Sequence, residues 1–316
     1  MAYKIGSFNC LNFGSGQSEK ARYIANIIAN EKFDIVALQE VKNRGALKLL
    51  LSALNNYPGN WEGDCEEREL ADYAFVWNTK RVQLVRVKNK NGERTVYPHT
   101  VTAKGASKVL ARAPYCARFE PSGPGVPKFE IRIINTHIRY GHQKSDSELA
   151  EYGLVALRKA EYTMLTQTIY PTVAGKSIID NMPTADFRPI YTIMLGDYNL
   201  NKVASGAKSP YLQDNYEYGY GERKKVIVTE QTDLTTLKQP QNSTGDNAQE
   251  RTPNFESVYA NNYDHVTYDK NRFDGIRLGY GSINAVEKYA ENDVERYRKD
   301  VSDHIPIFLS LELNGG

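Results

Sequence analysis

Residues 191–201 read YTIMLGDYNLN, and this stretch decides the fold class because it joins a buried strand to a polar tip. The apolar run at 193–195 is typical of a buried strand, one of several that alternate with helical patterns in an α/β arrangement. Gly196 and Asp197 follow at once, and Asn199 comes two residues later. Side chains two residues apart on an extended chain point to the same side, so we expect Asp197 and Asn199 to aim oxygen-bearing groups at one point.

Composition allows a large core but does not by itself select a function. The chain has 316 residues, of which 41% are hydrophobic and 25% are charged, values that are ordinary for globular proteins. Its formal net charge of +2 does not call for nucleic acid as a partner. Cys10, Cys65 and Cys116 lie far apart and form no CxxC pair, which argues against a disulfide framework and a zinc knuckle.

The N-terminus and the hydropathy pattern bear on location. The first ten residues, MAYKIGSFNC, lack the apolar segment of a signal peptide, and no apolar run in the sequence approaches about 18 residues. We therefore expect a cytoplasmic protein with no membrane insertion. The alternative is a secreted protein from which a signal peptide has been removed.

Five short apolar runs share one design, in which each run lies next to a polar residue capable of chemistry. Strands of a rigid sheet can present such residues at their tips, where the loops leave them accessible. Five tips of this kind suggest one converging site. The runs and their polar residues are YKIGSFNCLN at 3–12 with Asn9 and Asn12, DIVALQE at 34–40 with Glu40, FEIRIINTH at 129–137 with His137, YTIMLGDYN at 191–199 with Asp197 and Asn199, and VSDHIPIFLSL at 301–311 with Asp303 and His304.

Helical patterns alternate with these runs. Residues 18–31 and 44–56 each place their apolar side chains on one stripe. A third helix is predicted to begin at Ser145, where the spacing of a capping box occurs, and to end just before Pro171. We find no internal repeat and no interdomain linker, so we expect residues 1–316 to form one domain. Three stretches rich in glycine, proline and polar residues are predicted to be loops, at 171–189, 202–221 and 238–256.

The polar tips favour magnesium over zinc. They supply asparagine, glutamate, aspartate and histidine but no cysteine, and oxygen ligands of this kind suit Mg²⁺ or Mn²⁺. In NYDHV, strand alternation sends His265 to the opposite face if Asp264 points into the site. Each residue alone also has a structural explanation, since Glu40 could end a solvated strand and SDH at 302–304 could be a cap. Their joint occurrence favours the functional interpretation.

Eight motifs in a fixed order resemble those of the endonuclease/exonuclease/phosphatase superfamily, and most closely its DNase I-like branch. Each motif is weak alone, but together they cover nearly the whole chain. The resemblance implies one catalytic domain built as a four-layer α/β sandwich, with two mixed β-sheets face to face and helices outside, and Mg²⁺-dependent cleavage of a phosphoester. The motifs are FNCLNFG at 8–14, DIVALQEV at 34–41, DYAFVWNTKRV at 72–82, RAPYCARF at 112–119, INTH at 134–137, LGDYN at 195–199, YDHV at 263–266 and SDHIPI at 302–307.

The resemblance also implies roles for individual residues. Glu40 is the expected principal metal ligand, with Asn9 and Asp303 close to the ion or its waters. Asp197 and Asn199 are expected to orient the attacking water and the phosphate oxygens. His304, held by Asp264, is expected to be the general base or a phosphate-stabilising imidazole. His137 is expected to stabilise the phosphorane or assist the leaving oxygen. Arg112 and Lys42 are expected to contact the substrate phosphate.

Two positions depart from the DNase I-like pattern. Ala71 stands where a glutamate supports the histidine that corresponds to His137, so either Glu69 or Asp72 takes over this support or His137 has none. Lys42 follows QEV where that branch often has arginine. A lysine offers a weaker grip on phosphate because its ammonium group cannot bind two oxygens in a planar fork.

The leading hypothesis is a metal-dependent DNA endonuclease that leaves 3′-hydroxyl and 5′-phosphate ends, with Mg²⁺ as cofactor and Mn²⁺ or Ca²⁺ as alternatives. A second hypothesis is a phosphoesterase for lipid headgroups or inositol phosphates, although YDHV occupies the place of the tryptophan-cysteine-aspartate-arginine motif of inositol phosphatases. A third is a catalytically decayed binding module on the same fold. Basic stretches at 81–94 and 221–225 are candidate contacts to a phosphate backbone or simply solvated loops. No protein partner can be inferred.

Overall fold

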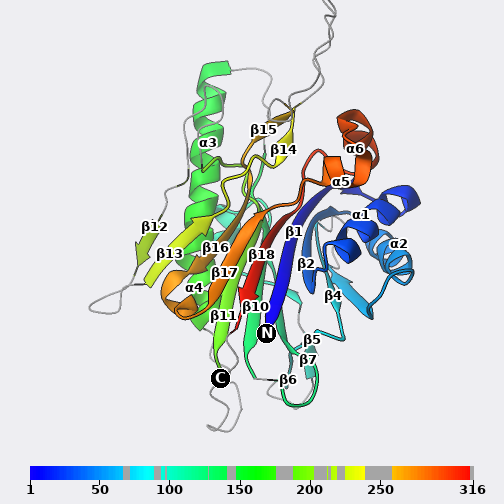
Figure 1. Cartoon of the computed structure of the whole chain (residues 1–316). Coiled ribbons are helices and arrows are strands. Elements are labelled where there is room, and N and C mark those ends of the chain that lie inside the picture. Colours follow the sequence, from blue (N-terminus) through cyan, green and yellow to red (C-terminus); the bar gives the residue numbers. More distant parts are fainter. Residues whose placement is uncertain are drawn as a thin grey trace, which may run out of the picture.

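Two β-sheets form the centre of the molecule (Figure 1). The computed structural model describes residues 1–66, 72–88, 94–96, 98–126, 128–140, 147–175, 188–202, 212, 215–218, 225–238 and 258–313. In the first sheet, β1 and β2 run parallel and the other neighbouring strands run antiparallel. The order of strands is β17 (Arg277–Ser282), β18 (Ile307–Glu312), β1 (Ala2–Phe13), β2 (Ile35–Val41), β4 (Tyr73–Asn78) and β3 (Trp61–Cys65).

The second sheet is also mixed, because β10 and β11 run parallel within otherwise antiparallel neighbours. Its order is β12 (Asn215–Tyr218), β13 (Lys225–Glu230), β16 (Asp264–Asp269), β11 (Ile190–Asp197), β10 (Glu130–His137), β9 (Tyr115–Pro121) and β5 (Val82–Leu84), with β8 (His99–Thr100) paired to β9. Two further strand pairs lie outside the large sheets, namely β14 (Thr236–Leu237) with β15 (Tyr259–Asn261), and β6 (Arg86–Lys88) with β7 (Arg94–Val96).

An apolar core holds the two sheets face to face. Ile5, Ile35 and Phe75 of the first sheet share this core with Ile133 and Ile193 of the second, and all five are fully buried. Burying aliphatic and aromatic side chains on both inner faces stabilises the sandwich, at roughly 25 cal/mol for each Å² of apolar surface removed from water. The same packing fixes the position of one sheet's strand ends relative to the other's.

Helices cover both outer faces and complete the four-layer sandwich that the family resemblance implies. Residues such as Ile24 of α1 and Leu50 of α2 pack with Phe8 and Leu38 on the outer side of the first sheet, while Tyr162 and Ile169 pack with Ile134 on that of the second. The first face carries α1 (Ser18–Asn30), α2 (Arg44–Leu54), α5 (Ala285–Ala290) and α6 (Val294–Asp300), and the second carries α3 (Ser147–Met164), a π-helical turn (Leu165–Ile169) and α4 (Tyr170–Gly175). Short 3₁₀ helices occupy Ala106–Lys108 and Lys270–Phe273.

The first two predicted helices are confirmed to within two residues, but the third continues past its predicted end. Pro171 was expected to follow the helix and instead lies in the first turn of α4. Proline is tolerated there because a backbone N–H at the start of a helical segment has no partner within that segment. The π-helical turn just before α4 is where the hydrogen bonding changes register.

One predicted loop also contains a strand. The tyrosine-rich stretch inside 202–221 forms β12, which pairs with β13 at the edge of the second sheet. Tyrosine favours strands, and this preference outweighs the neighbouring glycines that suggested a loop. The proposed cap at Ser145 and most of the loops at 171–189 and 238–256 fall outside the described residues. Within the described part of the chain, none of the helices combines the length and apolar character needed to cross a lipid bilayer.

Candidate active site

Three buried polar residues line up across the ends of neighbouring strands in the second sheet. His137, the last residue of β10, pairs in register with Asp197, the last residue of β11. Asp197 pairs in turn with Asp264, the first residue of β16. Because residues directly opposite one another in a sheet are neighbours on the same face, this register brings the three side chains together.

Gly196 allows β10 and β11 to approach closely at this row. Its φ of +146° lies in a region that other residues rarely adopt. A Cβ at this position would lie 1.8 Å from the carbonyl oxygen of Thr136, well inside contact distance. The glycine in LGDYN is therefore a structural requirement for placing Asp197 next to His137.

The first sheet contributes Asn9 and Glu40 from the facing side. Asn9 Nδ2 donates to Asp197 Oδ2 at 3.1 Å and to Glu40 Oε1 at 3.3 Å. The second oxygen of Glu40 accepts a hydrogen bond from the backbone N–H of Asn12 at 2.9 Å. Leu11, Asn12 and Glu40 all have φ between +45° and +60°, so the ends of β1 and β2 turn sharply here. The amide of Asn9 thus connects carboxylates that belong to different sheets.

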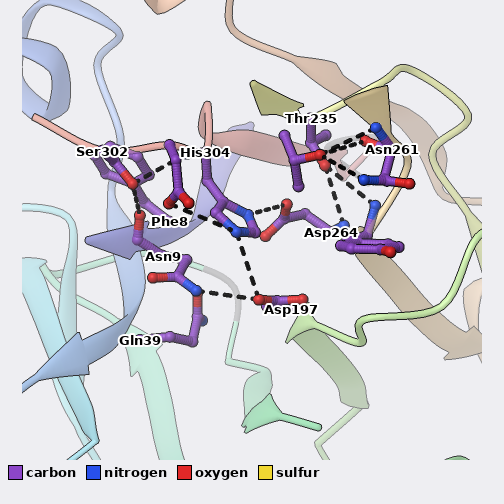
Figure 2. A network of polar contacts seen from close by, with 12 residues as sticks. Phe8, Asn9, Gln39, Asp197, Thr235, Asn261, Asp264, Ser302 and His304 are labelled. Carbon is purple, nitrogen blue, oxygen red and sulfur yellow. Dashed lines mark hydrogen bonds and ion pairs between the residues drawn. The ribbon is translucent and has the colours of Figure 1, made fainter. Parts of the chain in front are cut away.

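His304 is held by Asp264 at the edge of this group (Figure 2). Its Nδ1 lies 2.8 Å from Asp264 Oδ2, and its Nε2 lies 3.7 Å from Asp197 Oδ2. The backbone N–H of His304 donates to Ser302 Oγ, which itself donates to the carbonyl oxygen of Asn9 at 2.7 Å. Since a carboxylate only accepts, its contact places a hydrogen on Nδ1 and turns Nε2 towards Asp197.

His137 has the same arrangement with a different aspartate. Its Nδ1 lies 2.8 Å from Asp72 Oδ2, and its Nε2 lies 3.6 Å from Asp197 Oδ2. The backbone N–H of His137 donates to the Tyr73 hydroxyl at 2.9 Å. Asp72 therefore supports His137, and Glu69, the other residue considered for this support, lies outside the described residues. Two aspartate-supported imidazoles converge on one carboxylate oxygen.

One member of each Asp–His pair has a shifted pKa, namely His304 in the first pair and Asp72 in the second. Burial works to lower the pKa of His304, but the nearby carboxylates, mainly Asp264 and Asp197, outweigh it and raise that pKa to about 10. Burial works to raise the pKa of Asp72, but contacts with His137, Arg112 and Lys42 outweigh it and lower that pKa. The imidazole of His304 is accordingly cationic at neutral pH, and the carboxylate of Asp72 is anionic.

Asp197 is a fully buried carboxylate at the centre of these contacts. Complete burial raises its pKa, while His304, His137 and the backbone N–H of Asn199 act in the opposite direction. A carboxylate with a raised pKa accepts a proton more readily at neutral pH than an exposed one does. Its Oδ1 accepts the Asn199 N–H at 2.9 Å, which leaves Oδ2 facing the two imidazoles and Asn9.

Asn199 does not continue the extended strand, contrary to the expectation from alternation. The strand ends at Asp197, and Asn199 has a left-handed φ of +49°. Its Nδ2 donates to the carbonyl oxygen of Ile138 at 2.8 Å, and its own carbonyl oxygen accepts from Arg158 at 2.8 Å. The extended geometry failed because the Asp197 carboxylate captures the next-but-one N–H and bends the chain into a turn.

Two cations lie at the rim beside Asp72. Arg112 Nε is 3.3 Å from Asp72 Oδ2, and Lys42 Nζ is 3.8 Å from both Asp72 Oδ1 and Glu40 Oε2. Each of these two side chains is about a third exposed. They can therefore reach an anionic group that enters from solvent, as the family resemblance implies for the substrate phosphate.

The donors around Glu40 fit a hard divalent cation that keeps most of its water. Glu40 is partly exposed, and Asp303 Oδ1 lies 4.0 Å from His304 Nε2 on the neighbouring loop. Among the described residues, no three His, Cys, Asp or Glu side chains form a ready-made metal cage. Mg²⁺ commonly binds proteins through one or two carboxylates with water in the remaining positions, so this oxygen donor set suits it, whereas zinc favours nitrogen and sulfur.

Asn9 faces Glu40 with its amide nitrogen. Its Oδ1 accepts the Leu11 N–H at 3.0 Å, which leaves one lone pair on that oxygen. In this arrangement Asn9 orients the two carboxylates directly. A role next to the ion or its waters would use the remaining lone pair.

Several positioning residues were not found from the sequence. Thr235 Oγ1 accepts the N–H groups of Tyr263 and Asp264, and its carbonyl oxygen accepts that of Ile305, so it ties β16 to the His304 loop (Figure 2). Ser302 was quoted only as part of SDH, and nothing in the sequence around Thr235 signals its position. His265 behaves as predicted, since it is fully buried and its Nε2 contacts the carbonyl oxygen of Leu200 on the other side of the strand.

Comparison with known proteins agrees with this geometry. A family model described as the endonuclease/exonuclease/phosphatase family matches residues 6–304. The chain belongs to the endonuclease/exonuclease/phosphatase family. Members of this family hydrolyse phosphoester bonds and generally use divalent metal ions. No curated protein matches the chain.

Solved structures share the family fold over nearly the whole chain. Humanised TDP2 from D. rerio, which carries 14 mutations, is 11% identical with a TM-score of 0.54, covering 99% of both chains. Truncated TDP2 from Caenorhabditis elegans is 13% identical with a TM-score of 0.53, covering 99% of this chain and 98% of that one. A family protein from Bacteroides vulgatus is 11% identical with a TM-score of 0.53, covering 99% and 100%. At these identities the likeness establishes the fold alone.

Proposed function

We propose that this protein is a Mg²⁺-dependent phosphodiesterase that cleaves the DNA backbone internally and leaves 3′-hydroxyl and 5′-phosphate ends. The observation that carries the proposal is the convergence of two aspartate-supported imidazoles on Asp197 Oδ2, at 3.6 Å from His137 and 3.7 Å from His304. Hydrolysis of a phosphodiester requires an aligned water, a proton acceptor, and donors that neutralise charge on the phosphoryl oxygens. Asp197 could orient the water and accept its proton, and the imidazoles could neutralise charge on the phosphoryl oxygens.

Each residue has a distinct part in the proposed reaction. Asp197, with its pKa raised by burial, takes the proton of the attacking water. His304, cationic at neutral pH, stabilises the negative charge on the phosphoryl oxygens. His137, held by Asp72, assists the leaving oxygen. Asn199 fixes the orientation of Asp197 through its backbone N–H.

A divalent ion would complete the charge balance. Glu40 would hold it, with Asn9 and Asp303 near the ion or its waters. When bound, Mg²⁺ supplies neutralisation of the phosphate oxygens and of the departing oxygen. Arg112 and Lys42 would contact the substrate phosphate from the rim, where both side chains are partly exposed.

The choice of DNA rests on residue identity. Residues 263–266 read YDHV, similar to the corresponding motif of the DNase I-like branch, and the sequence lacks the tryptophan-cysteine-aspartate-arginine motif of inositol phosphatases. The rim cations Arg112 and Lys42 also suit a polyanion. We therefore place DNA ahead of lipid headgroups and inositol phosphates as the substrate.

A plasmid assay tests the proposal. The purified protein should nick supercoiled plasmid with Mg²⁺ or Mn²⁺ and lose this activity in EDTA, and Glu40→Ala should abolish it. Arg22→Ala serves as a matched control because Arg22 is exposed on α1 and pairs only with Glu19 among the described residues. Extension of the nicks by a DNA polymerase without prior phosphatase treatment would establish the 3′-hydroxyl ends.

Two results would overturn the proposal. Absence of nicking together with release of phosphate or phosphocholine from a lipid panel would show a headgroup phosphoesterase. Absence of any hydrolysis, with salt-sensitive binding of DNA retained, would show a decayed binding module. Binding to the DNA backbone should weaken steeply with salt because counterions are released on association.

A further inference from the structure

A tyrosine–arginine–tyrosine group lies next to the site and takes no part in the reaction described above. Tyr140 follows β10 by three residues, Arg158 belongs to α3, and Tyr263 directly precedes β16. The guanidinium carbon of Arg158 lies 5.6 Å from the centroid of the Tyr140 ring, within the range of a cation–π contact. The Tyr263 ring centroid lies 6.4 Å from that of Tyr140, with the two planes tilted by 49°.

Backbone contacts fix this group to the Asp197 turn. Arg158 donates to the carbonyl oxygen of Asn199 at 2.8 Å, and the carbonyl oxygen of Tyr263 accepts the N–H of Tyr198 at 2.8 Å. Arg158 also hydrogen-bonds to the side chain of Tyr263. The group therefore keeps a constant position relative to the carboxylate that faces both imidazoles.

Exposure separates Tyr140 from its two supports. Arg158 and Tyr263 are buried, at 9% and 7% exposed, whereas Tyr140 is 49% exposed and is one of few large hydrophobic side chains at the surface of the described residues. Arg158 and Tyr263 are buried, so a structural role accounts for them. Tyr140 is half exposed to solvent beside the proposed phosphate site, and packing alone does not account for its position.

We propose that Tyr140, held by Arg158 and Tyr263, is a stacking platform for an unpaired nucleobase next to the scissile phosphate. The proposal rests on the proposed function, since it supposes that the phosphate is part of a polynucleotide. A nucleobase stacks on a tyrosine ring through its flat face, and each such contact typically changes affinity by about 5- to 150-fold. In duplex DNA the faces of a base are already covered by its neighbours, so a platform of this kind favours single-stranded or unpaired positions.

A double-mutant cycle between protein and substrate tests this. A single-stranded oligonucleotide and the same oligonucleotide with the base deleted beside the cleaved bond are each cleaved by the parent and by Tyr140→Ala. We expect Tyr140→Ala to reduce kcat/KM by about tenfold on the intact oligonucleotide, but to change it little on the abasic one. Tyr140→Phe should retain parental kcat/KM, because the ring is kept.

A matched control is available in the surface pair Tyr23 and Arg296, which joins α1 to α6. The guanidinium carbon of Arg296 lies 5.8 Å from the Tyr23 ring centroid, so the pair repeats the tyrosine–arginine contact at another place in the fold. Tyr23→Ala should leave kcat/KM unchanged on both oligonucleotides. Equal losses for Tyr140→Ala on the intact and abasic substrates would overturn the stacking proposal and indicate a purely structural residue.

A binding readout separates this proposal from the proposed function. In metal-free buffer, an oligonucleotide carrying 2-aminopurine should show quenched fluorescence on binding the parent protein, and Tyr140→Ala should abolish the quenching. Quenching that depends on Tyr140 without any cleavage in Mg²⁺ would overturn the nuclease proposal and support the platform. Cleavage with unchanged quenching in Tyr140→Ala would support the nuclease proposal and overturn the platform.

Discussion

The two Asp–His pairs of the site are alike in geometry and differ in the charged groups that surround them. In both, an aspartate oxygen lies 2.8 Å from Nδ1 and Nε2 is turned towards Asp197. The neighbours of His304 are further carboxylates, whereas Asp72 also contacts two cations. The comparison teaches that a hydrogen-bonded aspartate fixes the orientation of an imidazole, while the charged groups around the pair decide in which direction a pKa is shifted.

Of the changes considered, removal of the His304 imidazole should have the largest effect on activity. His304→Ala takes away the imidazole whose charge is expected to stabilise the phosphoryl group, and we expect kcat for plasmid nicking to fall by about 10²- to 10³-fold. Steady-state rates with Mg²⁺ at neutral pH provide the measurement, with Arg22→Ala as the control. A loss smaller than about threefold would contradict the proposed role of His304.

The pH dependence of stability should separate the two pairs. The raised pKa of His304 contributes stability that is fully present below the unfolded pKa of about 6.5 and is lost as pH rises through about 10. The lowered pKa of Asp72 contributes stability that is present above its unfolded pKa and is lost as pH falls through the folded value. Denaturant unfolding in EDTA should therefore show a decline of a few kcal/mol on the alkaline side and a separate decline on the acid side.

Two variants show which residue causes each decline in stability. His304→Gln should reduce the alkaline decline and leave the acid one, and Asp72→Asn should do the reverse. If both variants changed the same limb of the profile, the assignment of the alkaline decline to His304 and of the acid decline to Asp72 would be wrong.

Gly196→Ala should disturb both pairs together. The new Cβ would meet the Thr136 carbonyl oxygen, and the φ of +146° is unfavourable for alanine. We expect the free energy of unfolding to fall by at least about 1–3 kcal/mol, the usual cost of a strained backbone residue. Urea unfolding measures this, with Gly105→Ala as a comparison at which φ is also positive but no atom lies within 4 Å. A similar loss in the two variants would mean that the contact with Thr136 adds nothing to the strain.

Lys42→Ala should have the smallest effect on stability. Its Nζ lies 3.8 Å from the nearest oxygens of Glu40 and Asp72 and the side chain is about a third exposed, so solvent screens both ion pairs. We expect the free energy of unfolding to change by less than about 1 kcal/mol. A larger change, measured in the same denaturant series, would show that Lys42 is an integral part of the Asp72 pair.

Much of the fold could be predicted because each strand carries its signal locally. The apolar runs that contain Glu40, His137 and Asp197 form strands, and both predicted N-terminal helices appear with nearly the predicted ends. The predictions that were wrong concern single residues, namely Pro171 and Asn199. Pro171 sits where its missing N–H costs nothing, and Asn199 leaves the extended conformation because Asp197 binds its N–H.

The sequence predicted which polar residues lie close together better than it predicted their contacts. Strand alternation correctly separated Asp264 from His265, since these neighbours point to opposite faces of one strand. The support of His137 could not be chosen from the sequence, because Asp72 meets it across 65 residues of chain. The inter-strand contacts of Thr235 likewise depend on tertiary packing that local patterns do not encode.

Because Asn9 contacts both Glu40 and Asp197, catalytic activity should depend on how well the two sheets stay aligned. Glu40 ends a strand of the first sheet and Asp197 ends one of the second, so a slip of one sheet along the other would separate them while each sheet kept its own hydrogen bonds. Both tryptophans, Trp61 and Trp77, lie in the first sheet and report on that sheet. In mild denaturant the protein should therefore lose catalytic activity before its tryptophan fluorescence changes.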